Sequence, residues 1–272
     1  MKKISILLLC ILSSNAFAQN GLRKIEVETY YVSDSNDAAY SKGKLPVGSV
    51  TYRVYVEMLP GYRFQAVYGI PNHELKIATS TSFYNDDTYG ASVPNVIPLR
   101  VVNSGLLLLD SWISVGAAAE SSYGVLKSND NGVNTLVNSS KVLQNNSKMA
   151  GISLAMQDGL VQGNPARVTA FGIDSALAMF GHGSTANSFI TTNGSWASLY
   201  GSIGPDSLHN NQVLIGQFTT DGVFSFEFNI QLGTPFGGVE NYVARNPNGT
   251  EILRKDLVFT SSNKATRKQG MK

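Results

Sequence analysis

Strict alternation of apolar and polar residues is the feature that most constrains the fold of this chain. Between positions 224 and 232 apolar and polar side chains take turns, in the order Phe224, Ser225, Phe226, Glu227, Phe228, Asn229, Ile230, Gln231, Leu232. Successive side chains of a β-strand point to opposite faces, so a period of two residues predicts strands with one buried face. A helix would instead bring together residues three and four positions apart.

The same alternation predicts two antiparallel hairpins. The first has one apolar face and one mixed face, with Tyr52, Val54, Val56 and Met58 opposite Thr51, Arg53, Tyr55 and Glu57. Pro60-Gly61 follows it and suits a tight turn, because proline fixes the first dihedral angle and glycine accepts a positive one. In the second hairpin, a strand at 213–219 and the turn dipeptide Asp221-Gly222 precede Phe224.

Helical signals are few. Asp174 is placed to cap a short helix that ends before Gly181. Residues 106–109 are apolar throughout, which is typical of a strand covered on both faces. With 26 glycines and strand signals at short intervals, the sequence predicts an all-β fold, an antiparallel β-sandwich with one short helix.

Composition divides the chain into five segments. We expect a signal peptide at 1–18, a first β-sandwich unit at 19–126, a polar connecting segment at 127–164, a second β unit at 165–260 and a basic, flexible tail at 261–272. The connecting segment is rich in turn-forming Asn, Ser and Gly. It either joins two tandem β units or decorates a crossover within one large sandwich. A Ser-Trp-x-Ser sequence that occurs at Trp112 and again at Trp196 favours two units.

The first 18 residues predict export by the general secretory route. Lys2 and Lys3 precede an apolar core too short to span a bilayer, and Ala16-Phe17-Ala18 matches a signal-peptidase site. Cleavage there would also remove Cys10, the only cysteine. The mature chain is therefore expected in the periplasm or outside the cell, stabilised by its core without any disulfide.

Charge argues against a nucleic-acid partner, and hydropathy argues against a transmembrane segment in the mature chain. Lys2 and Lys3 account for the formal net charge of +2, so the mature chain is neutral, with its basic excess confined to the tail. A nucleic-acid-binding protein would carry a basic face on its folded part. No second apolar stretch of membrane-spanning length follows the leader, so no transmembrane segment is expected in the mature chain.

Several segments carry a family resemblance. They are 51–68, 73–77, 83–86 and 109–112 in the first half of the chain, and 194–198, 213–222 and 224–233 in the second. Together they resemble a β-rich module of exported Bacteroidota proteins, and the resemblance covers most of residues 25–245. It implies a β-rich fold without an assigned activity. Relatives of that module often carry a C-terminal sorting domain, whereas this chain stops at a basic tail.

Catalytic constellations are weak in this sequence. The closest approach to a serine-hydrolase elbow is Gly201-Ser202-Ile203-Gly204, whose spacing does not match Gly-x-Ser-x-Gly, and its base would have to be His73, His182 or His209. A glycosidase needs two facing carboxylates, and the sequence does not single out a pair. The chain is therefore predicted to be non-catalytic, with a polysaccharide-active hydrolase as the alternative.

Metal chemistry reduces to one candidate. Without cysteine and with three scattered histidines, the mature chain has no zinc pattern. Calcium needs only oxygen ligands, and three segments offer them: 34–37, 85–87 and 129–132. The first, Asp34-Ser35-Asn36-Asp37, supplies them most densely. Asp34 and Asp37 are therefore the candidate calcium ligands, against the alternative that this segment forms a turn through side-chain bonds to its own backbone.

Aromatic side chains are the remaining lead to a ligand. Tyr55 lies opposite the apolar face of its strand, and Trp112 and Trp196 occur in the repeated Ser-Trp-x-Ser sequence. Such rings could stack on sugars, or they could fill the core of the sandwich. The sequence thus predicts an exported module that binds a glycan or an envelope or surface protein. A structural part of a surface assembly is a further alternative.

Overall fold

A computed structural model describes residues 20–139 and 142–261. The predicted signal peptide, Cys10 and all but the first residue of the predicted basic tail lie outside these residues. The described chain consists mainly of antiparallel strands with a few short helical turns, which confirms the all-β prediction. Along its described part, no helix is long and apolar enough to cross a membrane.

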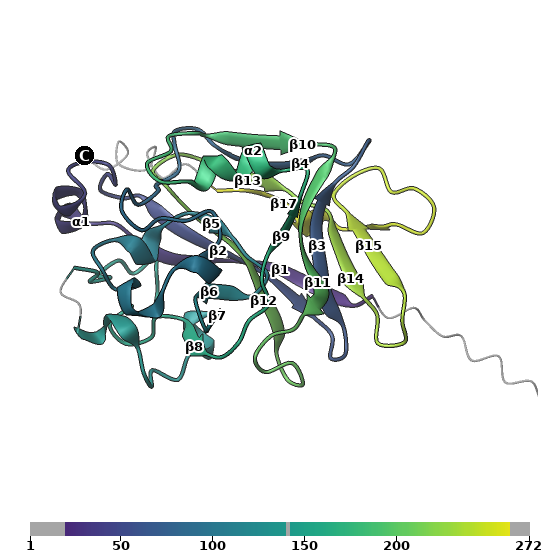
Figure 1. The fold of residues 1–272 in the computed structure, drawn as a ribbon, viewed down its shortest axis with the longest axis horizontal. Coiled ribbons are helices and arrows are strands. Elements are labelled where there is room, and N and C mark those ends of the chain that lie inside the picture. The colour runs from purple at the N-terminus through teal and green to yellow at the C-terminus, as the bar shows by residue number, and fades with distance from the viewer. Residues whose placement is uncertain (1–19, 140–141, 262–272) are drawn as a thin grey trace, which may run out of the picture.

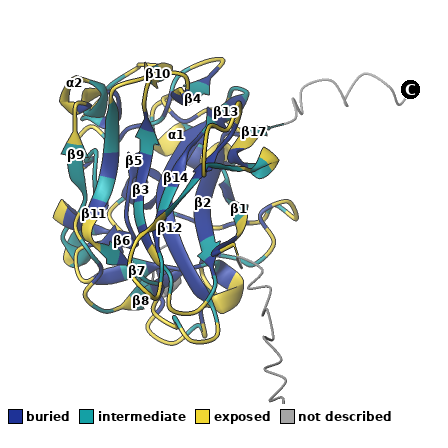
Figure 2. Cartoon of the chain, turned by 90° about the vertical axis from the view of Figure 1, so that its right-hand side faces the viewer, coloured by how far each residue is buried: buried dark blue, intermediate teal, exposed yellow. Residues whose placement is uncertain are grey.

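The central layer is an antiparallel sheet that we call sheet A. Its strands follow the order β1, β2, β12, β5, with bounds Leu22–Val32, Val50–Met58, Asn211–Thr220 and Trp112–Ile113. Strand β2 lies between β1 and β12 over its full length, and Val54 pairs with Val27 on one side and Gly216 on the other. In Figure 2, β2 and β12 run through the buried middle of the molecule.

A second layer consists of two sheets joined by a bend. One contains β16, β15, β14, β3, β11 and β9 in that order (Ile252–Leu253, Val239–Val243, Ile230–Gly233, Arg63–Gly69, Gly194–Ser202, Thr169–Phe171). The other contains β10, β4, β13 and β17 (Ser188–Thr191, Leu75–Thr79, Phe224–Glu227, Val258–Thr260). The chain passes directly from β3 to β4, from β10 to β11 and from β13 to β14, so the two sheets share three bent strand pairs.

Asn229 holds the bend in place. Its side-chain amide donates to the carbonyl oxygens of Tyr68 at 3.0 Å and Glu74 at 2.9 Å, and its Oδ1 accepts the backbone N–H of Ala244 at 3.2 Å. The side chain is buried. One carboxamide thus satisfies three backbone groups just before β14 begins, at the end of the ladder between β3 and β14.

The main core lies between sheet A and the bent layer. The predicted apolar face of β2 points into it through Tyr52, Val54 and Val56, and Trp196 and Phe228 enter from the bent layer. The alternating run that begins at Phe224 is also buried there, although it forms two strands, β13 and β14, in place of one. The period of two residues therefore predicted the buried face correctly but not the bend.

A lobe formed by residues 84–164 covers the other face of sheet A. It contains a small sheet of β6, β7 and β8 (Ala117–Ala119, Ser122–Gly124, Leu160–Gln162). Its 3₁₀ turns are η1 to η5 (Pro94–Val96, Leu99–Val101, Leu107–Leu109, Lys127–Asn129, Leu136–Ser139). A second core joins Tyr30, Tyr55 and Leu214 of sheet A to leucines of the lobe. Strands β2, β12 and β5 of sheet A are consequently buried on both faces almost throughout, whereas β1 is partly exposed.

The remaining short helices lie outside this lobe. They are α1 (Ser35–Tyr40), α2 (Asp174–Leu177), η6 (Ala178–Phe180) and η7 (Lys255–Leu257). The helix predicted from Asp174 to the residue before Gly181 is present as α2 and η6, but Asp174 is its first residue and not its cap. The predicted strand at 106–109 is wrong, because Leu107–Leu109 form η3, a single turn of the lobe whose leucines belong to the second core.

Strands from both halves of the chain belong to the same sheets. Strand β2 pairs with β12, and β3 pairs with β11 and β14. The connecting segment at 127–164 packs on sheet A as part of the lobe (Figure 1). The boundaries expected at residues 126 and 165 therefore do not separate the sheets, and the strands form one layered body.

Candidate functional site

The three aromatic residues predicted to bind a ligand are all buried. Tyr55 and Trp196 are 0% exposed and Trp112 is 2% exposed. Tyr55 lies on the face of β2 that the lobe covers, and Trp196 donates from Nε1 to the carbonyl of Ser114 at 3.1 Å. Since none of the three presents a ring to solvent, the predicted stacking surface is wrong. The rings fill the two cores, which was the alternative.

Asp34 and Asp37 form a helix cap. The Asp34 carboxylate accepts the backbone N–H groups of Asn36 at 2.8 Å and Asp37 at 3.1 Å, and Asp37 accepts the N–H of Asp34 at 2.8 Å. This reciprocal pair is a capping box at the start of α1. Asp37 also accepts the hydroxyl of Tyr31. The two carboxylates are therefore engaged by the backbone and Tyr31, which corresponds to the turn alternative.

Metal ligands do not gather elsewhere in the described chain. Residues 20–139 and 142–261 contain no group of three or more His, Cys, Asp or Glu side chains that could hold a metal ion. His73 is bonded through Nε2 to Glu251 at 2.9 Å, and His209 is bonded through Nδ1 to Asp206 at 2.9 Å. These histidines are therefore engaged with carboxylates on separate loops.

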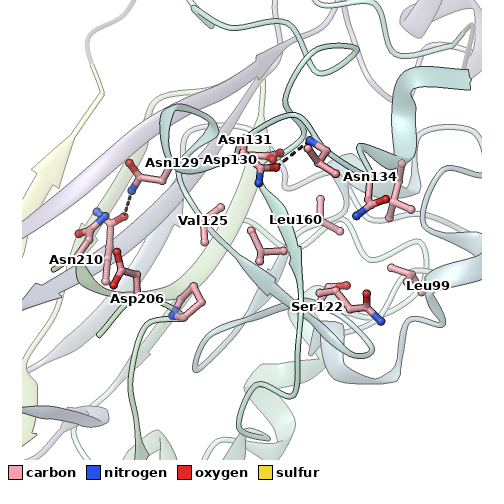
Figure 3. A pocket seen from close by; sticks show the side chains of 16 residues that line it. Leu99, Ser122, Val125, Asn129, Asp130, Asn131, Asn134, Leu160, Asp206 and Asn210 are labelled. Carbon is pink, nitrogen blue, oxygen red and sulfur yellow. Dashed lines mark hydrogen bonds between the residues drawn. The ribbon is translucent and has the colours of Figure 1, made fainter. Parts of the chain in front are cut away.

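A cleft of about 790 Å³ opens between the lobe and the β11–β12 connection. It is lined by Leu99, Ser122, Val125, Asn129, Asp130, Asn131, Val133, Asn134, Leu136, Leu160, Val161, Gln162, Pro205, Asp206, Asn210 and Gln212. In Figure 3, Asp206 and Asn210 lie on the left and Asn134 on the right, with Val125 and Leu160 between them and Asn131 above the middle. The cleft thus has two polar walls that face each other across an apolar floor.

Carboxamides dominate the polar walls. Six lining residues are Asn or Gln, and the lining contains no lysine, arginine, histidine or aromatic residue. Part of this wall is fixed by bonds of its own: Asn129 donates to Oε1 of Gln212 at 3.4 Å, and Gln212 donates to Glu26 at 3.1 Å. Each carboxamide offers both donors and an acceptor, so the walls suit an uncharged ligand with many hydroxyl or amide groups.

Asp130 shapes one wall of the cleft from within. Its two carboxylate oxygens accept the backbone N–H groups of Gly132 and Gly159, each at 2.9 Å. Gly132 has a positive φ of 70°, which lets the chain turn back beneath Asn131. Both oxygens of Asp130 are therefore used in forming the wall, and the side chain is buried.

Lys127 anchors the same wall to sheet A. Its ammonium is 2% exposed and donates to the carbonyl oxygens of Tyr30, Ala150 and Ile152. Burial lowers the pKa of this ammonium to about 8. The three carbonyls belong to β1 and to two points of the connecting segment, so one side chain joins the segment to the sheet.

Arg53 forms a second anchor below the cleft. Fully buried, it donates to Gln217 at 2.8 Å and to the carbonyl of Gly159 at 3.1 Å, and its guanidinium lies 3.6 Å from the centre of the Tyr30 ring. The Tyr30 hydroxyl donates in turn to the carbonyl of Asp158 at 2.6 Å. The polar segment of the chain is thus fixed through buried hydrogen bonds in addition to apolar contacts.

Three buried titratable side chains, Asp110, Asp158 and Lys127, lead us to expect an unusual pH dependence of stability. Burial raises the pKa of Asp158 to about 6 and that of Asp110 to about 8. Both carboxyls therefore bind a proton more tightly in the native state, and the stability this gives is lost as pH rises from about 4 to about 8. The pKa of Lys127 is lowered instead, so the native state binds this proton less tightly than the unfolded state. The stability that the neutral amine gives is therefore lost as pH falls through about 8.

We therefore expect the free energy of unfolding to be higher at pH 5 than at pH 8, as measured by urea titration. Asp110→Asn and Asp158→Asn should flatten the curve between these values. Greater stability at pH 8 than at pH 5 would contradict the assignment of these shifts.

Comparison with known proteins gives the site no precedent. No protein-family model, curated protein or solved structure matches this chain. The cleft is thus interpreted from its own residues. Sequence reasoning singled out the Asn129–Gly132 segment as a turn or a weaker calcium candidate. It missed Gln162, Asn210 and Gln212, because these come from separate strands and connections and share no local motif.

Proposed function

We propose that this protein is an exported, non-catalytic binding module that takes an uncharged glycan in the cleft between the lobe and the β11–β12 connection. The observation that supports this most is the lining, which combines six carboxamides with an apolar floor and lacks any cationic side chain. Sugars present hydroxyl groups at their edges and C–H groups on their faces, so they need both kinds of surface. The expected export agrees with such a ligand.

Polysaccharide hydrolysis is the second candidate, and one observation favours it. Asp130 and Asp206 are two carboxylates that line the same cleft. However, both oxygens of Asp130 accept backbone N–H groups, which leaves it poorly placed to exchange a proton with a substrate. Asp206 is exposed and paired with His209. We therefore favour binding over hydrolysis.

A glycan array followed by titration calorimetry tests the proposal. Gln162→Ala and Asn210→Ala should each weaken binding of a retained neutral glycan by about threefold to tenfold, because each removes a hydrogen-bonding group from the cleft. Gln144→Ala, an exposed glutamine outside the cleft, is the matched control and should leave the affinity unchanged.

Three outcomes would count against the proposed non-catalytic binding of a glycan in this cleft. If the array retains no neutral glycan, or if the cleft variants bind like the control, the ligand does not occupy this cleft. If the wild type shortens the retained glycan and Asp206→Asn does not, the hydrolase is the better description.

A further inference from the structure

The most exposed large apolar side chains of the described residues gather on two connections. Phe236 is 99% exposed, Tyr200 92%, Leu208 75% and Leu199 66%. Phe236 lies between β14 and β15, and the other three lie at the end of β11 or between β11 and β12. Isolated exposed apolar residues are common, but a cluster of the most exposed ones marks an interaction surface.

The two connections lie at the same end of the molecule. Strand β3 separates β14 from β11, and at its start Arg63 pairs with Gly233 while the next residue, Phe64, pairs with Ser202. Pro235 also packs near Gly61 of the β2–β3 turn. Figure 1 shows the β2–β3, β11–β12 and β14–β15 connections projecting from this end.

A closed turn holds Phe236 outward. Gly237 donates its backbone N–H to the carbonyl of Thr234 at 3.3 Å, and Thr234 donates its own N–H to Gly238 at 3.2 Å. The Thr234 hydroxyl donates to the carbonyl of Gly237. Gly237 and Gly238 have φ values of 85° and 88°, which residues with a side chain rarely adopt. The turn is therefore built in a way that keeps the ring at its tip.

A bulge does the same for Leu199 and Tyr200. The register of β11 against β3 passes from Ala197 opposite Ala66 to Ser202 opposite Phe64, so β11 contains extra residues that have no partner. Gly201, with φ of 71°, packs closely against Arg63 and allows the strand to rejoin the sheet. Bulges of this kind redirect side chains, and here they direct two apolar ones to solvent.

Arg63 supplies an exposed cation at this end of the molecule. Arg63 is exposed between the two connections and forms no ion pair within residues 20–139 and 142–261. The neighbouring acids are engaged: Asp206 pairs with His209, and Glu57 pairs with Arg23. Glu240 accepts hydrogen bonds from Gly21 and Tyr62. Arg63 is thus a cation between exposed apolar tips.

We propose that Leu199, Tyr200, Leu208, Phe236 and Arg63, here named the tip surface, dock this protein on an anionic phospholipid bilayer. The apolar tips enter the interfacial region, where tyrosine and phenylalanine rings are favoured, and Arg63 contacts the lipid phosphates. The tips are convex and stand on separate connections. A protein partner would need a matching hollow for each tip, whereas a bilayer accommodates several without preformed pockets.

Vesicle sedimentation tests the tip surface. The chain without residues 1–18, the expected signal peptide, should pellet with vesicles of phosphatidylcholine and phosphatidylglycerol, and less with phosphatidylcholine alone. Phe236→Ser and Tyr200→Ser should each lower the partition coefficient by about tenfold, because each removes an apolar side chain from the interface. Arg63→Ala should weaken binding to the mixed vesicles only. Tyr40→Ser, a 58% exposed tyrosine on α1, is the control and should bind like the wild type.

Three results would overturn the proposal. The first is wild-type protein that remains in the supernatant with both vesicle types, and the second is tip variants that pellet like the control. The third is a dimer, seen by analytical ultracentrifugation without lipid, that Phe236→Ser abolishes; it would assign the tip surface to a second copy of the chain. Because all the altered side chains are exposed, unchanged melting temperatures are expected and show that the variants fold.

Discussion

Replacing Lys127 with methionine should lower the free energy of unfolding by about 2–4 kcal/mol, because each buried carbonyl group left without a donor costs roughly 1–3 kcal/mol and water recovers part of this. Methionine fills a similar volume but cannot donate a hydrogen bond, so the carbonyls of Tyr30, Ala150 and Ile152 would lose a shared donor. A domain of this kind has roughly 5–15 kcal/mol of total stability, and the loss would be a large part of it.

Lys148→Met is the matched control for this substitution. Lys148 lies in the same polar segment but is exposed, so its replacement should change the free energy of unfolding by less than about 0.5 kcal/mol. Urea titration gives the two values. Hydrogen exchange should show, in addition, that Lys127→Met increases exchange in residues 142–164 more than in β2 and β12. Equal stability of the two variants would mean that the ammonium does not anchor the segment.

The Lys127 anchor also explains why the cleft could not be predicted. The connecting segment is rich in Asn, Ser and Gly, so its composition predicted a linker. Its attachment depends on Lys127, Asp130 and Asp158, whose partners lie far away along the chain or in the backbone. A lysine in a polar stretch is normally a solvated surface residue, and nothing local distinguishes Lys127 from Lys148.

The strand pattern was more informative because it depends on local geometry alone. Alternation around Val54 and around Phe226 predicted which side chains enter the main core, and both do. Alternation could not show that the opposite face of β2 is covered too, and for that reason Tyr55 was expected at the surface. A face of mixed composition such as Arg53 and Tyr55 can be solvated or can be buried with hydrogen-bond partners, and only the lobe decides between them.

The same limit applies to the aromatic residues. The most exposed aromatic rings among the described residues are those of Tyr200 and Phe236, and not those of the tryptophans. Phe236 follows Thr234-Pro235 and precedes Gly237-Gly238, a turn sequence that could have indicated an exposed position. Tyr200 gave no such signal, since its exposure results from a bulge that depends on the pairing of β11 with β3.

Replacing Asn229 with alanine should destabilise the fold by about 2–4 kcal/mol, although only a few atoms are removed. In the alternating run, Asn229 occupies a polar position like Ser225 or Gln231, and the pattern assigns it to a solvated face. It is instead buried at the bend, where the carbonyls of Tyr68 and Glu74 and the N–H of Ala244 depend on it. Each buried polar group left unpaired costs roughly 1–3 kcal/mol, and water entering the gap would recover part of this.

Asn229→Asp provides a sharper test than alanine, because it keeps the shape and the acceptor but loses both donors. If the two donated bonds hold the bend, Asn229→Asp should be at least as destabilising as Asn229→Ala at pH 7, where a buried carboxylate would face two carbonyl oxygens. Asn187→Ala, an exposed asparagine, should stay within about 0.5 kcal/mol of the wild type in the same urea titration. An aspartate variant as stable as the wild type would show that the bend is held by the packing of Trp196 and Phe228 against each other and not by the carboxamide.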